Sequence, residues 1–236
     1  MLNNIKSNMS VKLVVFDMAG TTVKDDQDVS KAFQSALLKY NYHVPLTVID
    51  HFMGYEKPYA ISQMLHKYEA EKEKITTDLI NDIHVEFVDQ MIEHYRSTPD
   101  IAALPNVEDT FKHLHNEGIK IGINTGFSKD IAQTIIDRLQ WQQKGLIDYI
   151  MGSDEVEKGR PYPFMIQNMV QRAGITDPQE VVKVGDTEVD IREGQNAKCK
   201  FVIGITTGSF TRNELEEFEP THIIDNITQV IEIISQ

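Results

Sequence analysis

The chain has 236 residues, which is enough for one large α/β domain or for a core with a smaller inserted domain. Its formal net charge of −13 argues against nucleic-acid binding, which needs lysines and arginines clustered on one face. No apolar segment is long enough to cross a bilayer, and the polar residues 1–10 lack the apolar stretch of a signal peptide. The single cysteine, Cys199, excludes an intrachain disulfide. We therefore expect a cytoplasmic protein without a membrane or nucleic-acid partner.

The first predicted element is a strand at Leu13–Phe16, a short apolar run rich in β-branched residues. Such a run is typical of a buried parallel strand, and it ends on a carboxylate, Asp17, followed by Gly20 and two threonines. The carboxyl end of a strand faces the ligand crevice in an open α/β sheet, so Asp17 is a candidate for chemistry. The structural alternative is an aspartate that only caps the next helix.

The next part of the chain, roughly residues 23–104, is predicted to be helical. Apolar residues recur at helical spacing in the segments 29–42, 59–68 and 77–96. Pro99 and Pro105 then bracket a short connector that is typical of a hinge between two domains. These features predict a helical domain inserted into another domain.

From Asn106 onward, predicted helices and strands alternate. In chain order they are a helix at 107–117, a strand at 119–124, a helix at 128–139, a strand at 149–151, a helix at 163–173, a strand at 181–184, a helix at 189–197, a strand at 201–206, a helix at 212–218, a strand at 221–224 and a terminal helix. This alternation indicates a parallel sheet covered on both faces. The predicted fold is a three-layer, Rossmann-like α/β core of residues 1–22 and 105–236, interrupted by the helical insertion 23–104.

Residues 17–21 read Asp-Met-Ala-Gly-Thr and resemble the first motif of the haloacid dehalogenase superfamily, which usually reads Asp-x-Asp-x-Thr. The resemblance implies that Asp17 attacks phosphorus and forms an aspartyl phosphate. In members that cleave phosphate esters, the second Asp protonates the leaving alkoxide, and the methyl group of Ala19 cannot donate a proton. Alanine at this position is typical of the phosphonoacetaldehyde hydrolase (phosphonatase) subgroup. The same resemblance identifies the insertion 23–104 as a helical cap.

Two further segments resemble phosphate-binding motifs of this superfamily. Thr125-Gly126 resembles the second motif, whose hydroxyl and N–H bind phosphoryl oxygens, although an ordinary turn is the alternative. Residues 157–163 resemble the third motif, with Arg160 in the place of the usual lysine, as in the phosphonatase subgroup. Arg160 would supply positive charge and two parallel hydrogen bonds to an oxygen pair. By the resemblance, the residues that contact the substrate are Met18, Ala19, Thr125, Gly126 and Arg160.

The segment Gly185-Asp186, with Asp190 four residues later, resembles the metal motif of the superfamily. Carboxylate and carbonyl oxygens are ligands that suit Mg²⁺. The resemblance implies that Mg²⁺ is held by Asp17, the main-chain carbonyl of Ala19 and Asp186, while Asp190 steadies these ligands.

Residues 53–57, Met-Gly-Tyr-Glu-Lys, resemble the phosphonatase element whose lysine condenses with the substrate aldehyde. The resulting iminium accepts the electrons of the breaking C–P bond. Pro58 suits the first position of a helix, which would place Lys57 at the positive end of the helix dipole and lower the pKa of its amine. A solvated lysine at a helix start is the alternative. Three positions depart from the phosphonatase pattern: Gln27 replaces a cysteine, Ala60 a histidine and Phe127 a tyrosine.

The favoured function is therefore Mg²⁺-dependent hydrolysis of a small phosphorylated or phosphonylated metabolite, by a monomer or homodimer. Phosphonoacetaldehyde or a similar carbonyl phosphonate, bound to Lys57 as a Schiff base, is the leading substrate. One alternative is a phosphomonoesterase or acyl phosphatase without a Schiff base, and another is a ligand-binding relative that has lost catalysis. The first two interpretations require Asp17 and Asp186 to lie close enough to share one cation.

Overall fold

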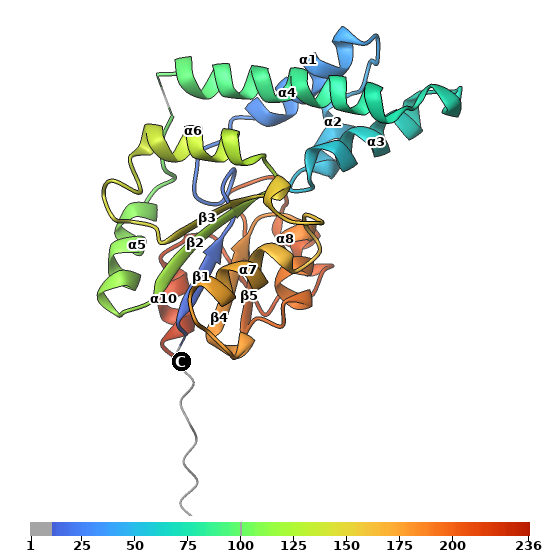
Figure 1. Cartoon of the computed structure of the whole chain (residues 1–236). Helices are drawn as coiled ribbons and strands as arrows, with labels where there is room; N and C mark the ends of the chain where they lie inside the picture. Colours follow the sequence, from blue (N-terminus) through green and yellow to red (C-terminus); the bar gives the residue numbers. More distant parts are fainter. Residues whose placement is uncertain (1–10, 100) are drawn as a thin grey trace, which may run out of the picture.

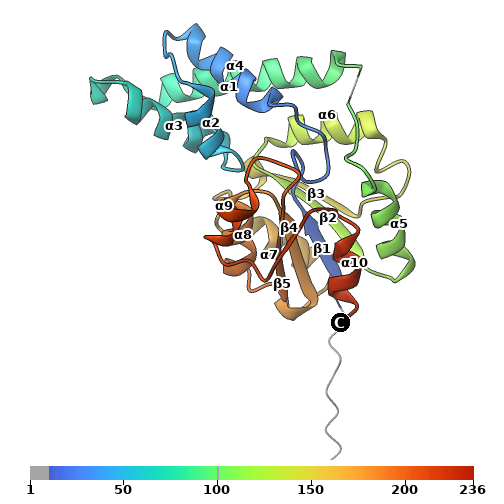
Figure 2. The ribbon, with the colours of Figure 1, turned by 180° about the vertical axis from the view of Figure 1, so that it is seen from behind.

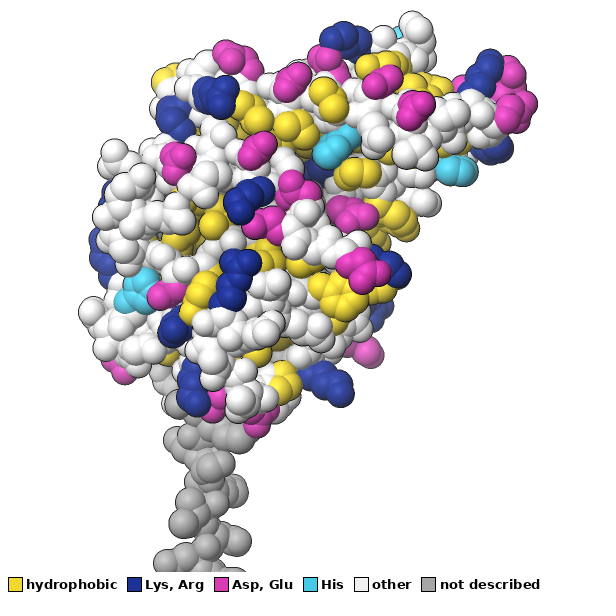
Figure 3. All heavy atoms as spheres, viewed as in Figure 1, with side chains coloured by type: hydrophobic (Ala, Val, Ile, Leu, Met, Phe, Trp, Pro, Cys, Tyr) yellow, Lys and Arg dark blue, Asp and Glu magenta, His cyan; other side chains and the backbone are white. Residues whose placement is uncertain are grey.

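A computed structural model describes residues 11–99 and 101–236 of the chain. Residues 1–10, for which the sequence predicts a polar segment without signal-peptide character, lie outside the described residues. In the part of the chain that is described, no helix combines the length and the apolar character needed to cross a bilayer. On the face shown in Figure 3, acidic and basic side chains are interspersed over both the sheet region and the helices above it.

Within the described residues, six strands form one parallel sheet in the order β3-β2-β1-β4-β5-β6. The strands are β1 (Leu13–Phe16), β2 (Lys120–Thr125), β3 (Tyr149–Gly152), β4 (Val181–Gly185), β5 (Phe201–Ile205) and β6 (His222–Ile224). The chain leaves β1 toward one edge for β2 and β3, and then returns to the other side of β1 for β4 to β6. This reversal opens a crevice at the carboxyl ends of the strands, where doubly wound sheets bind ligands. The parallel α/β sheet predicted from the sequence is confirmed.

Helices cover both faces of the sheet, which makes three layers (Figures 1 and 2). The side chains of β1 alternate between two buried clusters, with Val14 and Phe16 in one and Leu13 and Val15 in the other. The first cluster includes side chains of α5 (Val107–Asn116), α6 (Lys129–Leu139) and α10 (Gln229–Ile234). The second includes side chains of α7 (Phe164–Arg172), α8 (Glu188–Asn196) and α9 (Arg212–Glu216).

A further layer of helices lies beyond the carboxyl edge of the sheet (Figure 1). It contains α1 (Asp28–Lys39), α2 (Leu46–Ile49), α3 (Lys57–Tyr68) and α4 (Thr77–Ser97). The two connections to the sheet run side by side, because Lys24 N–H donates to the Ala102 carbonyl at 3.0 Å and Leu104 N–H to the Thr22 carbonyl at 2.9 Å. Short 3₁₀ helices occur at η1 (Asp50–Phe52), η2 (Lys72–Lys74), η3 (Ser153–Glu155) and η4 (Pro178–Glu180).

The interior of the helical layer is built around two stacked aromatic rings. Phe33 of α1 and Phe87 of α4 have ring centroids 4.3 Å apart and planes 26° apart, and both side chains are fully buried. On the sheet side, Arg138 of α6 donates hydrogen bonds of 2.6–2.8 Å to the carbonyl oxygens of residues 95, 96 and 98 at the end of α4. The apolar interior of the layer is continuous with the buried cluster that contains Val14 and Phe16 of β1, and α6 anchors the layer to the sheet region.

Replacing Phe87 with alanine should lower the free energy of unfolding by about 3–5 kcal/mol, because the change removes a fully buried ring and leaves a cavity against Phe33. Val85→Ala is the matched control, since Val85 lies on the same helix and is 58% exposed. Its effect should stay below about 0.5 kcal/mol. Urea denaturation measures both values, and equal losses would refute the central role of the ring pair.

Candidate active site

Asp17 lies directly after the central strand β1, at the carboxyl edge of the sheet. The Asp17 backbone N–H donates to the Val184 carbonyl on β4 at 2.9 Å, and the Asp17 carbonyl accepts a hydrogen bond from the Thr22 hydroxyl at 2.8 Å. Asp17 is only 5% exposed and lines a pocket beneath the helical layer. Burial raises the pKa of Asp17, while the neighbouring Arg160 opposes that rise.

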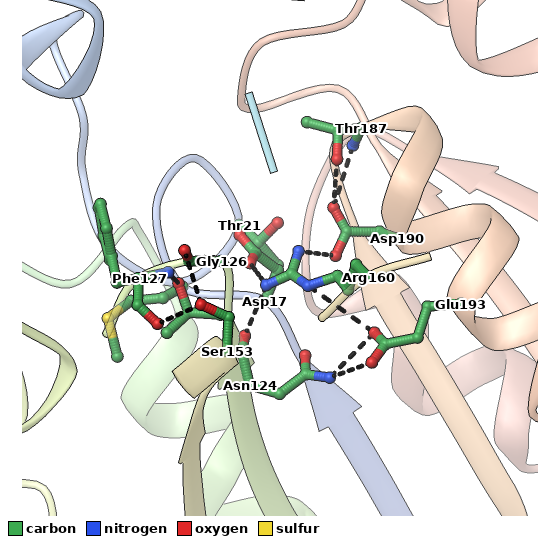
Figure 4. Close-up of polar contacts among 12 residues, drawn as sticks. Asp17, Thr21, Asn124, Gly126, Phe127, Ser153, Arg160, Thr187, Asp190 and Glu193 are labelled. Carbon is green, nitrogen blue, oxygen red and sulfur yellow. Dashed lines mark hydrogen bonds and ion pairs between the residues drawn. The ribbon is translucent and has the colours of Figure 1, made fainter. Parts of the chain in front are cut away.

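The guanidinium of Arg160 is buried between two carboxylates (Figure 4). One nitrogen, Nη2, donates to Asp17 Oδ1 at 2.6 Å and to the Asn124 carbonyl at 3.1 Å, and the other, Nη1, pairs with Asp190 Oδ1. Burial by itself raises the pKa of Asp190, but Arg160 and Lys183 together bring it below its usual value. Arg160 thus orients Asp17 and links the ends of β1 and β2 to α8.

Three buried residues that the sequence analysis did not single out support Arg160 from below. Lys183 Nζ donates to Asn124 Oδ1 at 2.6 Å, and lies 3.0 Å from Asp190 Oδ1 and 3.3 Å from Glu193 Oε2. The Asn124 amide donates to both carboxylate oxygens of Glu193, at 2.8 and 2.9 Å. The sequence contains one indication of this network, because a lysine inside the apolar strand β4 needs a buried partner. Glu193 lies one helical turn beyond Asp190, on the same face of α8.

The Asp186 carboxylate is held by short contacts with backbone and hydroxyl groups. It accepts hydrogen bonds from the Thr21 hydroxyl at 3.0 Å and from the Ser209 N–H at 2.7 Å. Gly20 and Gly208 approach it so closely that a Cβ atom would lie 2.8 Å or 2.0 Å from Oδ2, respectively. Gly20 also has a φ of +84°, a conformation that glycine adopts without strain. The loop after β1 and the loop after β5 together form the cradle of Asp186.

The charge balance of the buried cluster fits a divalent cation. Oxygen atoms of Asp17, Asp186 and Asp190 all lie within 4.8 Å of one another. Burial, followed by the charges of the two other aspartates, raises the pKa of Asp186 to about 8. When all four acids of the cluster are ionised, their charge exceeds that of the two cations by two negative charges. The charged groups counted are Asp17, Asp186, Asp190, Glu193, Arg160 and Lys183. Such an oxygen-rich, doubly negative site suits Mg²⁺.

The other residues predicted to contact substrate fall into two groups. Ala19, Thr125 and Gly126 line the pocket in front of Asp17. Thr125 is the last residue of β2, which extends one residue beyond the predicted strand end, and its hydroxyl accepts a hydrogen bond from the Phe127 N–H at 3.2 Å. The Met18 side chain, by contrast, is fully buried in the hydrophobic core.

Lys57 enters the same pocket from the helical layer. Lys57 is 3% exposed, and its Nζ lies 5.0 Å from the ring centroid of Phe127 and 5.4 Å from that of Phe33. Burial, with the positive charge of Arg160, lowers the pKa of Lys57 to about 7. Helix α3 begins at Lys57 itself, so Pro58 is the second residue of the helix and not, as the sequence predicts, the first. Lys57 is therefore not the solvated lysine that the sequence left as the alternative.

Asp25 is a further acid in this pocket that the sequence analysis missed. Its Oδ1 accepts hydrogen bonds from the N–H groups of Asp28 at 2.8 Å and Val29 at 3.3 Å, at the start of α1. Burial raises the pKa of Asp25 despite these hydrogen bonds. Ala60, where the phosphonatase pattern has a histidine, is fully buried and offers no acid or base.

Known proteins match the chain over most of its length. Residues 14–205 match the family model described as haloacid dehalogenase-like hydrolase. A phosphonoacetaldehyde hydrolase from Latilactobacillus sakei is 30% identical over 226 residues, which cover 91% of this chain and 81% of the relative. A phosphoglycolate phosphatase from Aliivibrio fischeri is 24% identical, with coverage of 95% and 97%.

Solved structures share the fold at lower identity. The crystal structure of a phosphonoacetaldehyde hydrolase-like protein from Oleispira antarctica has a TM-score of 0.81 and 18% identity, and the match covers 100% of this chain and 95% of that one. Some curated relatives are longer, and the chain spans 34% of a bifunctional phosphonoacetaldehyde hydrolase/aminoethylphosphonate transaminase from Clostridioides difficile.

The buried carboxylates predict an unusual pH dependence of stability in metal-free protein. Folding raises the pKa of Asp186 from 3.8 to about 8, so the folded state binds this proton more tightly than the unfolded state. The stability that this proton contributes is therefore lost as the pH rises from about 4 to about 8. Asp186→Asn, which carries no charge, should therefore melt several degrees above the wild type at pH 8.5 in EDTA. For a chain of this size, each kcal/mol of stability raises the melting temperature by about 2–4 °C.

Scanning fluorimetry at pH 6 and pH 8.5 measures this difference, which should widen with pH. Excess Mg²⁺ should stabilise the wild type and not the variant, because Asn lacks the charge that the cation needs. Equal melting temperatures of the two proteins at pH 8.5 in EDTA would show that Asp186 is not a strained buried acid.

Proposed function

Because the chain belongs to the haloacid dehalogenase-like hydrolase family, we propose that it is a Mg²⁺-dependent enzyme that hydrolyses a small phosphorus-containing metabolite through an aspartyl phosphate on Asp17. The observation that carries the proposal is the convergence of Asp17, Asp186 and Arg160 in one buried, oxygen-rich cluster. Within this reaction class, phosphonoacetaldehyde or a similar carbonyl phosphonate is the leading substrate. We further propose that residues 23–104 act as a cap that closes over the core of residues 1–22 and 105–236.

The core residues each have a distinct part in phosphoryl transfer. Arg160 binds Asp17 Oδ1 at 2.6 Å, which holds the carboxylate in one orientation for attack on phosphorus. The hydroxyl of Thr125 and the N–H of Gly126 bind the phosphoryl oxygens, and the guanidinium stabilises the charge that develops on them. Asp17, Asp186 and the Ala19 carbonyl hold Mg²⁺, which neutralises phosphoryl charge when it is bound. Water then releases phosphate from Asp17.

The leaving group separates the two candidate substrate classes. Ala19 stands where an esterase has its general acid, and a methyl group cannot protonate an alkoxide. Substrates whose leaving group departs without such protonation are therefore favoured. A carbonyl phosphonate activated by an amine is one such class, and an acyl phosphate is the other.

Lys57 supports the phosphonate class because a buried amine with a pKa of about 7 is substantially neutral at physiological pH. The neutral amine adds to the aldehyde carbon, and loss of water gives an iminium. When the C–P bond breaks, its electron pair flows into the iminium, and the resulting enamine takes up a proton. Water then hydrolyses the iminium so formed, which releases the aldehyde product and restores the Lys57 amine. Asp25 lines the same pocket and is the acid available to exchange these protons, in place of the histidine that Ala60 replaces.

Phosphate release from phosphonoacetaldehyde, measured with Mg²⁺, is the test of the substrate class. Lys57→Ala should lower kcat/KM for this substrate by at least about 10³-fold, because the electron sink is lost. The same change should affect acetyl phosphate by less than about tenfold. Lys67→Ala, at an exposed position of the same helix, is the matched control and should change neither.

Borohydride trapping provides an independent measurement of the Schiff base. Since the pKa of Lys57 is about 7, the neutral fraction of the amine should rise about tenfold between pH 6 and pH 8. The yield of the reduced adduct on Lys57, read by peptide mass spectrometry, should follow that rise. Absence of an adduct on Lys57 at pH 8, with phosphate still released, would favour the phosphatase alternative.

The second candidate is a phosphomonoesterase or acyl phosphatase whose substrate has a stable leaving group, so that Ala19 is no handicap, and the similarity to a phosphoglycolate phosphatase favours it. In this case Ala19→Asp should raise hydrolysis of alkyl phosphates by roughly 10²-fold, because it restores a general acid. Ala19→Asn has a similar size without the acid and should show no gain. Failure to release phosphate from any phosphonate, ester or acyl phosphate would instead support the ligand-binding alternative.

A further inference from the structure

The segment Gly54–Glu56, which immediately precedes Lys57, lies directly against loops of the sheet region. A Cβ atom on Gly126 would lie 2.5 Å from the carbonyl oxygens of both Gly54 and Tyr55. A Cβ atom on Gly54 would lie 2.4 Å from the hydroxyl oxygen of Thr187. Because no side chain fits between these surfaces, the segment packs directly against the Gly126 backbone and the Thr187 side chain.

The same segment makes one polar side-chain contact across the seam. Glu56 Oε2 accepts a hydrogen bond of 2.8 Å from the backbone N–H of Gly159. Gly159 is buried, and a Cβ atom there would lie 2.8 Å from Glu56 Oε2 and 3.0 Å from its Cβ. Glu56 is the neighbour of Lys57 and Gly159 is the neighbour of Arg160. A single hydrogen bond therefore connects the residues adjacent to the two cations of the candidate site.

We propose that Glu56 is a positioning residue whose hydrogen bond to the Gly159 N–H latches the helical layer onto the sheet region. The latch holds Lys57 in the pocket of Asp17 and Arg160 in its pairing with the Asp17 carboxylate. A hydrogen bond to a carboxylate is stronger than one between neutral groups, and without it a buried N–H loses its partner. This inference uses the proposed function for its activity measurement only, because the latch itself acts without substrate.

The surroundings of Glu56 allow the latch to open. Glu56 and Gly159 line a groove together with the side chains of Tyr55, Tyr59 and Tyr162. Tyr59 and Tyr162 are 43% and 46% exposed, so solvent reaches this groove. When the layers separate, water can hydrogen-bond both the carboxylate and the N–H, which offsets part of the cost of breaking their contact. A contact that opens and closes in each turnover needs water to replace the hydrogen bond in this way.

Lysine accessibility tests the latch directly, without substrate. Reductive methylation with formaldehyde and cyanoborohydride at pH 9, where Lys57 is neutral, should label Lys57 about tenfold faster in Glu56→Ala than in the wild type. Glu56→Gln keeps an oxygen that accepts the same hydrogen bond and should label like the wild type. The exposed Lys67 serves as the reference site within the same peptide map. Glu73→Ala, at an exposed site of the helical layer, is the matched control for loss of charge.

Activity provides the second readout. Glu56→Ala should lower kcat/KM by about 10–100-fold, and Glu56→Gln should restore it to within about threefold of the wild type. Gly159→Ala should mimic Glu56→Ala, because its methyl group forces the same two groups apart. In the double variant, the effects should not add, since both changes break one contact.

The outcomes separate this inference from the proposed reaction. Faster labelling of Lys57 in Glu56→Ala, without hydrolysis of any substrate, would support the latch and refute the proposed function. Unchanged labelling in Glu56→Ala, or equal losses in Glu56→Gln and Glu56→Ala, would overturn the latch and leave the hydrolase proposal intact. Additive losses in the double variant would also overturn it.

Discussion

The pairing of Arg160 with Asp17 and Asp190 is the interaction on which the rest of the site depends. A guanidinium with no exposed surface is tolerable only because carboxylates lie on both sides of it. That requirement brings the ends of β1 and β2, the loop before α7 and the start of α8 to one point. The deeper network of Asn124, Lys183 and Glu193 then keeps the buried charges hydrogen-bonded.

Burial acts in opposite directions on the two reactive groups beneath the helical layer. It disfavours the charged form of either group, so the pKa of Lys57 falls to about 7 while that of Asp186 rises to about 8. A lysine that has lost its proton is a nucleophile, whereas a crowded group of carboxylates attracts a cation. One physical effect, exclusion of water, thus shifts the pKa of Lys57 on α3 and that of Asp186 between the loops after β1 and β5.

Particular elements show how far the sequence predicts this structure. The strand at Leu13–Phe16, the alternation after Asn106 and the three long helices of the insertion follow from apolar periodicity, and the structure has each of them. The single-turn helix α2 was not predicted, because four residues carry too little periodicity. Asp25 and the triad of Asn124, Lys183 and Glu193 were also missed, since no local pattern indicates which distant polar groups meet.

By itself, the sequence determined the parallel α/β sheet, the position of Asp17 at a strand end and the order of the motifs, because these depend on periodicity along the chain. Only the tertiary structure decided which groups share a buried space and therefore which pKa values shift. It brought Lys57 into the pocket of Asp17 and joined Glu56 to Gly159 across 103 positions of sequence. Such contacts join residues that are far apart in the sequence, so the local spacing of residues does not predict them.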